Sequence, residues 1–165
     1  MEPATIHATT ILLGDAGAAF GGGSDAGVLL LGKPGSGKSS LALRLLTLGA
    51  QLIADDRTHV FLRENALWAR APAAIAGLLE VRGVGILQVP HADCARIWLA
   101  VVLEPGVENA RIPLPRYFEA PAGFADAAAV PLITLDGANP AAAERIAAAA
   151  ATFRLGLFRE QAHSG

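Results

Sequence analysis

The chain has 165 residues, of which 53% are hydrophobic and 17% charged, a composition that excludes a disordered protein. Its formal net charge of -2 argues against a nucleic-acid partner, and its single cysteine, Cys94, excludes an internal disulfide and suits a reducing compartment. Because the apolar runs are too short for a bilayer and the N-terminus lacks a signal-peptide pattern, we expect one cytoplasmic domain over residues 1–165, with no membrane partner.

The first third of the chain predicts strands separated by a loop and a helix. Residues 6–13 predict a strand, and residues 14–27, with three consecutive glycines, predict a loop. The apolar run 28–31 predicts a buried strand, and the helix that follows a glycine-rich loop is expected to end at Gly49. Residues 51–54 predict another buried strand.

The remaining predicted elements complete an α/β pattern. They are a hairpin over 58–62 and 67–71 around Glu64-Asn65, a short helix over 73–79, a loop over 82–85, strands over 97–103 and 130–135, and a helix over 141–153 capped by Asn139 and Pro140. Residues 105–129 are rich in Pro, Gly and Ala, and we interpret them as a mobile segment over a binding site. The tail 159–165 is expected to be loosely ordered.

One octet has the pattern G-x-x-x-x-G-K-[ST] of a phosphate-binding P-loop, and it lies between the apolar run and the predicted helix. It consists of Gly32, Lys33, Pro34, Gly35, Ser36, Gly37, Lys38 and Ser39. Its glycines allow backbone N–H groups to turn toward phosphate oxygens. Lys38 is expected to contact the β- and γ-phosphates, and the Ser39 hydroxyl to bind Mg²⁺. The sequence therefore predicts a nucleotide-binding protein.

Two acidic sites follow the P-loop. Asp55 and Asp56 come at the end of a predicted strand, where α/β sheets bind ligands, so one carboxylate is expected near the metal and the other to accept a proton. The residue pattern leaves their order open. Glu80 and Arg82 flank a glycine-containing loop, as a candidate metal ligand and a charge-stabilising, nucleotide-contacting residue.

Histidines and later arginines provide further candidates. His7 lies on the predicted strand before the P-loop strand, and its titration near neutral pH suits it to tune a neighbouring acid. The other histidines, His59, His91 and His163, lack metal-ligand spacing. Arg111 and Arg116 are each candidates for an arginine that reaches the phosphates.

The P-loop, the Asp pair and the stretch Leu78–Ile86, in that order, resemble the catalytic domain of the HPr kinase/phosphorylase family. The resemblance implies a P-loop kinase-like mixed sheet with flanking helices, related to phosphoenolpyruvate carboxykinase. It implies ATP- and Mg²⁺-dependent phosphorylation of a serine in HPr, the phosphocarrier of the sugar phosphotransferase system, and phosphorolysis that yields pyrophosphate. It also implies regulation of carbon metabolism and a hexameric homo-oligomer.

The resemblance also implies roles for single residues. One of Asp55 and Asp56 is the base, His7 assists it, Glu80 is the second metal ligand and Arg111 matches a later catalytic arginine. The family segment V-P-V-x-x-G-R-N corresponds to residues 130–139, where its arginine is missing, so the phosphorylase half stays open. Two alternatives remain: a P-loop kinase for a small metabolite, and a non-catalytic nucleotide-binding regulator.

Overall fold

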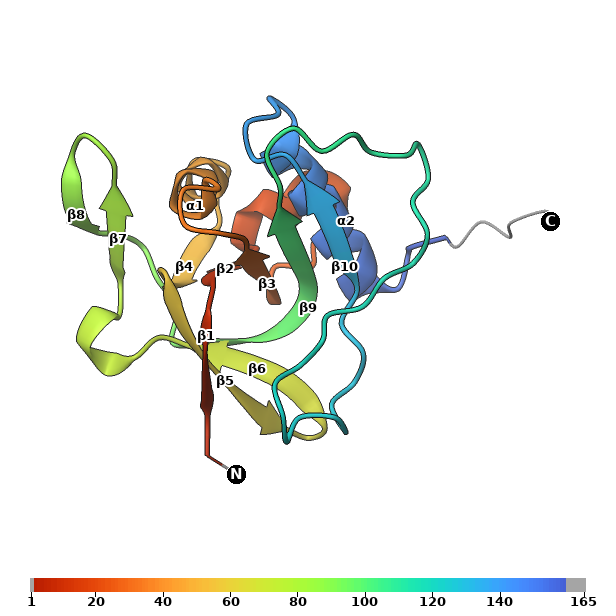
Figure 1. Ribbon diagram of the computed structural model, residues 1–165, viewed down its shortest axis with the longest axis horizontal. Helices are drawn as coiled ribbons and strands as arrows, with labels where there is room; N and C mark the ends of the chain where they lie inside the picture. The colour runs from red at the N-terminus through yellow and green to blue at the C-terminus, as the bar shows by residue number, and fades with distance from the viewer. Residues whose placement is uncertain (1, 160–165) are drawn as a thin grey trace.

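A mixed eight-stranded sheet forms the centre of the computed structural model, which describes residues 2–159 (Figure 1). The strand order is β1-β5-β6-β9-β3-β2-β4, and β10 pairs with β9. These strands are β1 (Ala4–His7), β2 (Thr9–Leu12), β3 (Ala26–Leu31), β4 (Gln51–Ala54), β5 (Arg57–Arg63), β6 (Ala66–Arg70), β9 (Cys94–Leu103) and β10 (Leu132–Leu135). Strands β3, β9 and β10 are parallel, whereas the other pairs are antiparallel. The predicted α/β class with a mixed sheet is confirmed.

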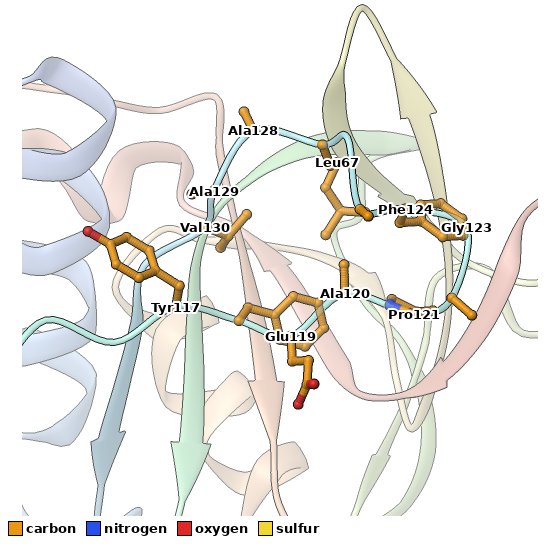
Figure 2. Close-up of a pocket in the computed structure, with 14 residues that line it drawn as sticks. Leu67, Tyr117, Glu119, Ala120, Pro121, Gly123, Phe124, Ala128, Ala129 and Val130 are labelled. Carbon is orange, nitrogen blue, oxygen red and sulfur yellow. The ribbon is translucent and has the colours of Figure 1, made fainter.

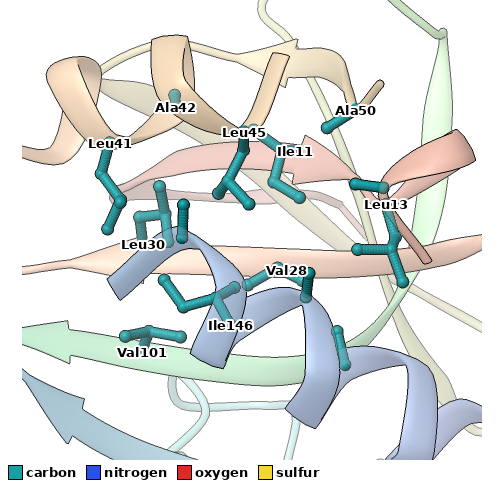
Figure 3. Close-up of a cluster of buried hydrophobic side chains, with 14 of the residues drawn as sticks. Ile11, Leu13, Val28, Leu30, Leu41, Ala42, Leu45, Ala50, Val101 and Ile146 are labelled. Carbon is teal, nitrogen blue, oxygen red and sulfur yellow. The ribbon is translucent and has the colours of Figure 1, made fainter. Parts of the chain in front are cut away.

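Two helices cover one face of this sheet, and the main core lies between them and the strands (Figure 3). They are α1 (Lys38–Thr47) and α2 (Ala142–Leu155). Leu41 and Leu45 of α1 meet Val28 and Leu30 of β3 in this core. The buried residues of α2 are alanines apart from Ile146, so this helix packs close to the sheet. Alanine combines high helix propensity with the small volume that such packing requires.

The other face of the sheet is covered by irregular chain. Phe124 and Val130, from the segment 105–129 and its end, are buried in a second core with Leu67 and Ile97. Residues 117–130 also line a hollow of about 400 Å³ beside Leu67 (Figure 2). The apolar residues of the segment thus close a core, a role that its irregular sequence did not indicate.

Residues 4–12 and 51–60 form one bent antiparallel ribbon. One arm of the ribbon is the pair β1–β5, which lies at one end of the sheet. The other arm is the pair β2–β4, which lies at the opposite end. At the bend the Ala8 N–H donates to the Asp56 carbonyl at 3.1 Å. The prediction of one strand over 6–13 was wrong, because Ala8 is where the chain passes from one arm to the other.

Three other predictions need correction. The expected loop 14–27 contains a 3₁₀ helix, η1 (Gly14–Phe20). The expected helix over 73–79 is only a 3₁₀ turn, η2 (Ala73–Ile75), because Gly77 has a left-handed φ of 76° and the chain continues as a strand. That strand, β7 (Leu78–Val81), forms a separate hairpin with β8 (Gly85–Gln88), so the predicted loop over 82–85 is the hairpin turn.

Two local predictions match the structure closely. Glu64 and Asn65 both have left-handed φ angles and join β5 to β6 as a hairpin. The Asn139 side-chain oxygen accepts the Ala141 N–H at 2.8 Å, so it caps a turn that precedes the regular start of α2 at Ala142. Residues 160–165, which include His163 and most of the predicted tail, lie outside the described residues.

Candidate active site

The P-loop follows the C-terminal end of β3 and leads directly into α1. Gly32 has a φ of 145°, and a Cβ there would lie 2.5 Å from the Ser36 hydroxyl and 2.9 Å from the Leu103 carbonyl, so only glycine fits. Gly35 and Gly37 have φ angles of 82° and 96° and face open space. Gly37 also caps the N-terminus of α1, where backbone N–H groups and the helix dipole favour an anion.

Two side chains of the loop suit a polyphosphate. The Lys38 ammonium lies against the loop, donating to the carbonyls of Gly32 at 2.8 Å and Lys33 at 3.2 Å. The buried hydroxyl of Ser36 has no hydrogen-bond partner among residues 2–159. An unpartnered buried hydroxyl, a lysine and a glycine-lined loop at a helix N-terminus are donors that phosphate oxygens satisfy.

The loop 136–140 supports the P-loop from the side. Arg44 of α1 donates to the carbonyls of Gly137, Asn139 and Pro140, the last at 2.7 Å. Asp136 accepts the N–H groups of Gly106 and Ala138, each at 2.9 Å, and these bonds lower the pKa of its carboxyl group. Sequence reasoning missed Arg44, because no local pattern shows which carbonyls lie within its reach.

Asp55 is buried, and its carboxylate accepts three hydrogen bonds. Its Oδ1 accepts the hydroxyls of Ser39 at 2.7 Å and Thr9 at 3.0 Å, and its Oδ2 accepts the backbone N–H of Glu80 at 3.0 Å. The contact joins the Ser39 hydroxyl of the P-loop to the carboxylate of Asp55 at the end of β4. A P-loop hydroxyl and an aspartate are the two groups that hold Mg²⁺ in P-loop NTPases. These oxygen ligands fit Mg²⁺, which uses few protein ligands and several phosphate and water oxygens.

Asp56 differs from Asp55 although it is the next residue. Its side chain is exposed and makes no hydrogen bond within the described chain. Its backbone has a left-handed φ of 68°, which Asp tolerates better than most residues, and its N–H donates to Thr9 Oγ1 at 3.2 Å. The bend of the ribbon therefore turns the two carboxylates to different environments, one buried and one facing solvent.

Thr9 connects the two aspartates and was not identified from the sequence. This fully buried residue of β2 donates to the Asp55 carboxylate and accepts from the Asp56 backbone. A threonine in a strand carries no signal beyond β propensity, and only the pairing of two distant strands shows its partners.

Glu80 and Arg82 lie on the separate β7–β8 hairpin. The backbone of Glu80 is next to Asp55 through the hydrogen bond to Oδ2, and its carboxylate is exposed. Arg82 lies in the hairpin turn, also exposed. The structure thus brings the main chain of Glu80 next to Asp55. Arg82 lies two residues further along the chain, just after the end of β7.

His7 ends β1 opposite the residue that follows the Asp pair, and Arg111 lies in the irregular segment before β10. His7 is exposed and pairs with Arg57, the residue that follows Asp56. Arg111 lies between Asn109 and Arg116, which both bond to Thr134 of β10. Between residues 2 and 159, no hydrogen bond or ion pair joins Arg111 to the P-loop or to the Asp pair.

The hollow under residues 117–130 carries no comparable chemistry. Its lining is mostly alanine and other apolar residues, with Glu119 as its single charged side chain (Figure 2). The described residues contain no cluster of three His, Cys, Asp or Glu side chains able to hold a metal. Nor do they include a helix that is sufficiently long and apolar to cross a membrane.

Comparisons with known proteins agree with this geometry. Residues 23–95 match the family profile of the HPr serine kinase C-terminal domain. The "HPr kinase/phosphorylase" of Streptococcus equi subsp. zooepidemicus is 41% identical over 86 residues, which cover 47% of this chain and 28% of the relative. The protein of the same name from Clostridium acetobutylicum is 44% identical over 64 residues, 39% of this chain and 21% of the relative. The match therefore spans under a third of these curated relatives.

A solved structure extends the likeness beyond the matched segment. The Hpr(Ser) kinase/phosphatase from Coxiella burnetii superimposes with a TM-score of 0.73 at 23% identity, over 93% of this chain and 92% of that one. At this identity the likeness shows the fold alone. The predicted resemblance to the HPr kinase/phosphorylase family is confirmed: residues 23–95 match its kinase domain profile, and nearly the whole chain has the fold of an HPr kinase/phosphatase.

Proposed function

We propose that the chain is an ATP- and Mg²⁺-dependent protein serine kinase that phosphorylates HPr. The observation that carries the proposal is the paired arrangement of a P-loop serine bonded to buried Asp55 and an exposed Asp56 beside it. Nucleotide binding alone requires no free carboxylate at this position, whereas transfer to a hydroxyl requires a group to orient it and take its proton. The names of the curated relatives support HPr as the acceptor.

The P-loop and its neighbours hold the donor. The backbone N–H groups around Gly35 and Gly37, together with Lys38, bind the phosphate oxygens, and Lys33, Pro34 and Ser36 complete the loop. Ser39 and Asp55 would hold Mg²⁺, which would neutralise charge on the phosphates. We keep Glu80 as a further metal ligand and Arg82 as a nucleotide contact, since the backbone of Glu80 is already bonded to Asp55.

Asp56 is assigned the role of the base. Asp55 already accepts three hydrogen bonds, so the exposed carboxylate next to it is the one free to accept the serine proton. The serine oxygen attacks the γ-phosphorus, the bond to the β-phosphate oxygen breaks, and ADP leaves. His7, at the end of β1, is proposed to face the same carboxylate and assist it. Arg111 stays a proposed catalytic arginine on the resemblance alone, since it forms no hydrogen bond or ion pair with the P-loop or the Asp pair within residues 2–159.

We propose that the same groups catalyse phosphorolysis of phosphoserine-HPr. Inorganic phosphate attacks the phosphoserine phosphorus, the bond to the serine oxygen breaks, pyrophosphate forms, and Asp56 returns the proton to the serine. Phosphorolysis uses phosphate where the reverse of the kinase step would use ADP, but both need a group at the serine oxygen that can hold or release a proton, and Asp56 fills that role. The family segment V-P-V-x-x-G-R-N contains an arginine, and the corresponding stretch of this chain does not. Ala138 lies in that stretch, on the loop 136–140.

We further propose a cytoplasmic homo-oligomer. The single cysteine, Cys94, suits a reducing compartment. Val84 and Ile86 on the β7–β8 hairpin are 70% and 72% exposed, and Leu157 is 65% exposed. Exposed apolar side chains of this size mark interaction surfaces, and light scattering coupled to gel filtration tests the assembly.

The experiment compares Asp55→Asn with Asp56→Asn. Purified protein is incubated with γ-labelled ATP, Mg²⁺ and HPr, and in reverse with phosphoserine-HPr and phosphate. Asp56→Asn is expected to lose transfer by roughly 100-fold or more while it still binds Mg·ATP. Asp55→Asn is expected to lose the Mg²⁺-dependent part of nucleotide affinity as well.

An HPr variant with alanine at its acceptor serine is the control. Transfer by Asp56→Asn at the wild-type rate contradicts the assignment of the base. Labelling of small hydroxyl compounds but not of HPr contradicts the proposed acceptor. If all variants and the wild type bind nucleotide equally and none transfers phosphate, the proposal that the chain is an enzyme is contradicted.

A further inference from the structure

Four arginines and three aromatic residues form one continuous surface on β5, β6 and β9. We call this surface the arginine–aromatic face; its members are Phe61, Arg63, Trp68, Arg70, Arg96, Trp98 and Arg154. The surface extends across three strands, because Phe61 of β5 lies opposite Trp68 of β6, and Trp68 lies opposite Arg96 of β9. Arg154 joins it from the last turn of α2.

The guanidinium groups stack on the rings. Arg63 lies 4.4 Å from the centre of Trp68, and Arg96 lies 4.2 Å from the centre of Trp98. A hollow of about 430 Å³ opens between Trp68, Trp98 and Arg154. Stacking fixes the orientation of each planar group while its N–H donors stay free at the rim.

The face carries more positive charge than its surroundings neutralise. Within the described part of the chain, Asp25 is the one carboxylate that forms an ion pair here, with Arg154 at 2.8 Å. This hydrogen bond, together with weaker charge effects of Arg154 and Arg96, lowers the pKa of Asp25. Among residues 2–159, Glu64 and Asp93 flank the face in sequence without an ion pair to it, and no hydrogen bond from the Arg63, Arg70 or Arg96 side chain to the protein is found there.

We propose that the arginine–aromatic face is a docking surface for an acidic segment of a partner protein. Arginine and tryptophan are enriched among the residues that contribute most to binding at protein interfaces. A guanidinium group held in place by stacking can bind one carboxylate through two N–H donors. Single-stranded nucleic acid is a poorer match, because it needs free ring faces for its bases, and the guanidinium groups occupy them here.

The surface is separate from the candidate active site. Arg96 pairs with Ala26 at the start of β3, whereas the P-loop follows Leu31 at the other end of that strand. A partner docked here therefore leaves the phosphate loop open. The inference does not depend on the proposed kinase activity.

The test uses the chain's own fluorescence. Both tryptophans of the sequence, Trp68 and Trp98, lie on this face, so their emission reports on it directly. The full chain is titrated at low salt with an eight-residue polyglutamate peptide, a polyglutamine peptide of equal length, and oligo-dT. Saturable change with polyglutamate alone is expected, weakened by salt.

Two variants of equal charge complete the test. Arg63→Gln combined with Arg96→Gln is expected to weaken polyglutamate binding roughly tenfold, since two charge contacts, one exposed and one half-buried, are lost. Arg145→Gln combined with Arg159→Gln removes two charges elsewhere and should leave it unchanged. Equal binding of polyglutamine, tighter binding of oligo-dT, or equal loss in both variants overturns the proposal. So does gel filtration that shows a wild-type oligomer dissociated by the first variant alone, because a second copy then covers the face.

Discussion

Thr9→Val is the most informative single substitution, because Thr9 touches both aspartates without being able to touch substrate itself. The change keeps the size and β-branching of a fully buried side chain and removes only its hydroxyl. Two hydrogen bonds disappear: the one donated to Asp55 at 3.0 Å and the one accepted from the Asp56 N–H at 3.2 Å.

The expected loss of stability follows from these two bonds. A hydrogen bond to a charged group contributes about 1.5–3 kcal/mol, and a neutral one about 0.5–1.5 kcal/mol. The added methyl group is buried and offsets part of this, so the free energy of unfolding should fall by about 2–3 kcal/mol. Because Asp56 loses a bond that fixes its backbone, we also expect kcat for transfer to HPr to fall roughly tenfold.

Thr10→Val is a matched control on the same strand. Thr10 is equally buried, but its hydroxyl bonds to that of Thr58, which in turn donates to the Ala8 carbonyl. One neutral bond is lost, so the expected change is about 1 kcal/mol with kcat unaltered. Urea unfolding measures stability and labelled ATP measures transfer. Equal effects of both substitutions on kcat would refute the argument that Thr9 positions the aspartates.

Three further predictions concern other parts of the molecule. Lys38→Ala should lower kcat/KM for transfer roughly 100-fold or more. The fold should survive in circular dichroism, since within residues 2–159 the Lys38 side chain bonds to nearby P-loop carbonyls and to no other element. Asp25→Asn should reduce stability by under about 1 kcal/mol, because its pair with Arg154 is exposed. Its pKa is lowered in the folded state, so this difference is present above pH 3.8 and vanishes as the pH falls through the folded pKa, which urea curves at several pH values will show. Ala150→Leu should destabilise by about 1–3 kcal/mol in thermal melts by overpacking the fully buried face of α2, and an unchanged melting temperature contradicts that view of the helix.

Local chemistry made part of the fold predictable. The strand, loop and helix of the P-loop follow from glycine positions and an apolar run, and the β5–β6 hairpin follows from residues that tolerate left-handed angles, such as Asn65. The apolar stretch at Leu78–Leu79 suits a helix or a strand equally, so β7 was missed. Segment 105–129 has no periodicity, and its buried Phe124 shows its role only in three dimensions.

The sequence indicated the P-loop and the Asp pair as candidate site residues, but not the hydrogen bonds that distinguish Asp55 from Asp56. The P-loop and the Asp pair follow from the rule that ligands bind beyond strand ends. What separates Asp55 from Asp56 is hydrogen bonding from Ser39, Thr9 and the Glu80 backbone, which are 16, 46 and 25 residues from Asp55. No local pattern specifies bonds between residues so far apart in the sequence.

The hydrogen bonds from Arg44 to the carbonyls of the loop 136–140 have a consequence for how the chain folds during synthesis. The carbonyls that it holds are 93 to 96 residues further along the chain, and β3, which leads into the P-loop, obtains its parallel neighbour only when β9 has emerged. Contacts between such distant residues form slowly. The apolar run Val28–Leu31 can pair with β2 as soon as it is made, but its β9 side stays unpaired, so a nascent chain of this protein exposes one aggregation-prone strand edge until its second half leaves the ribosome.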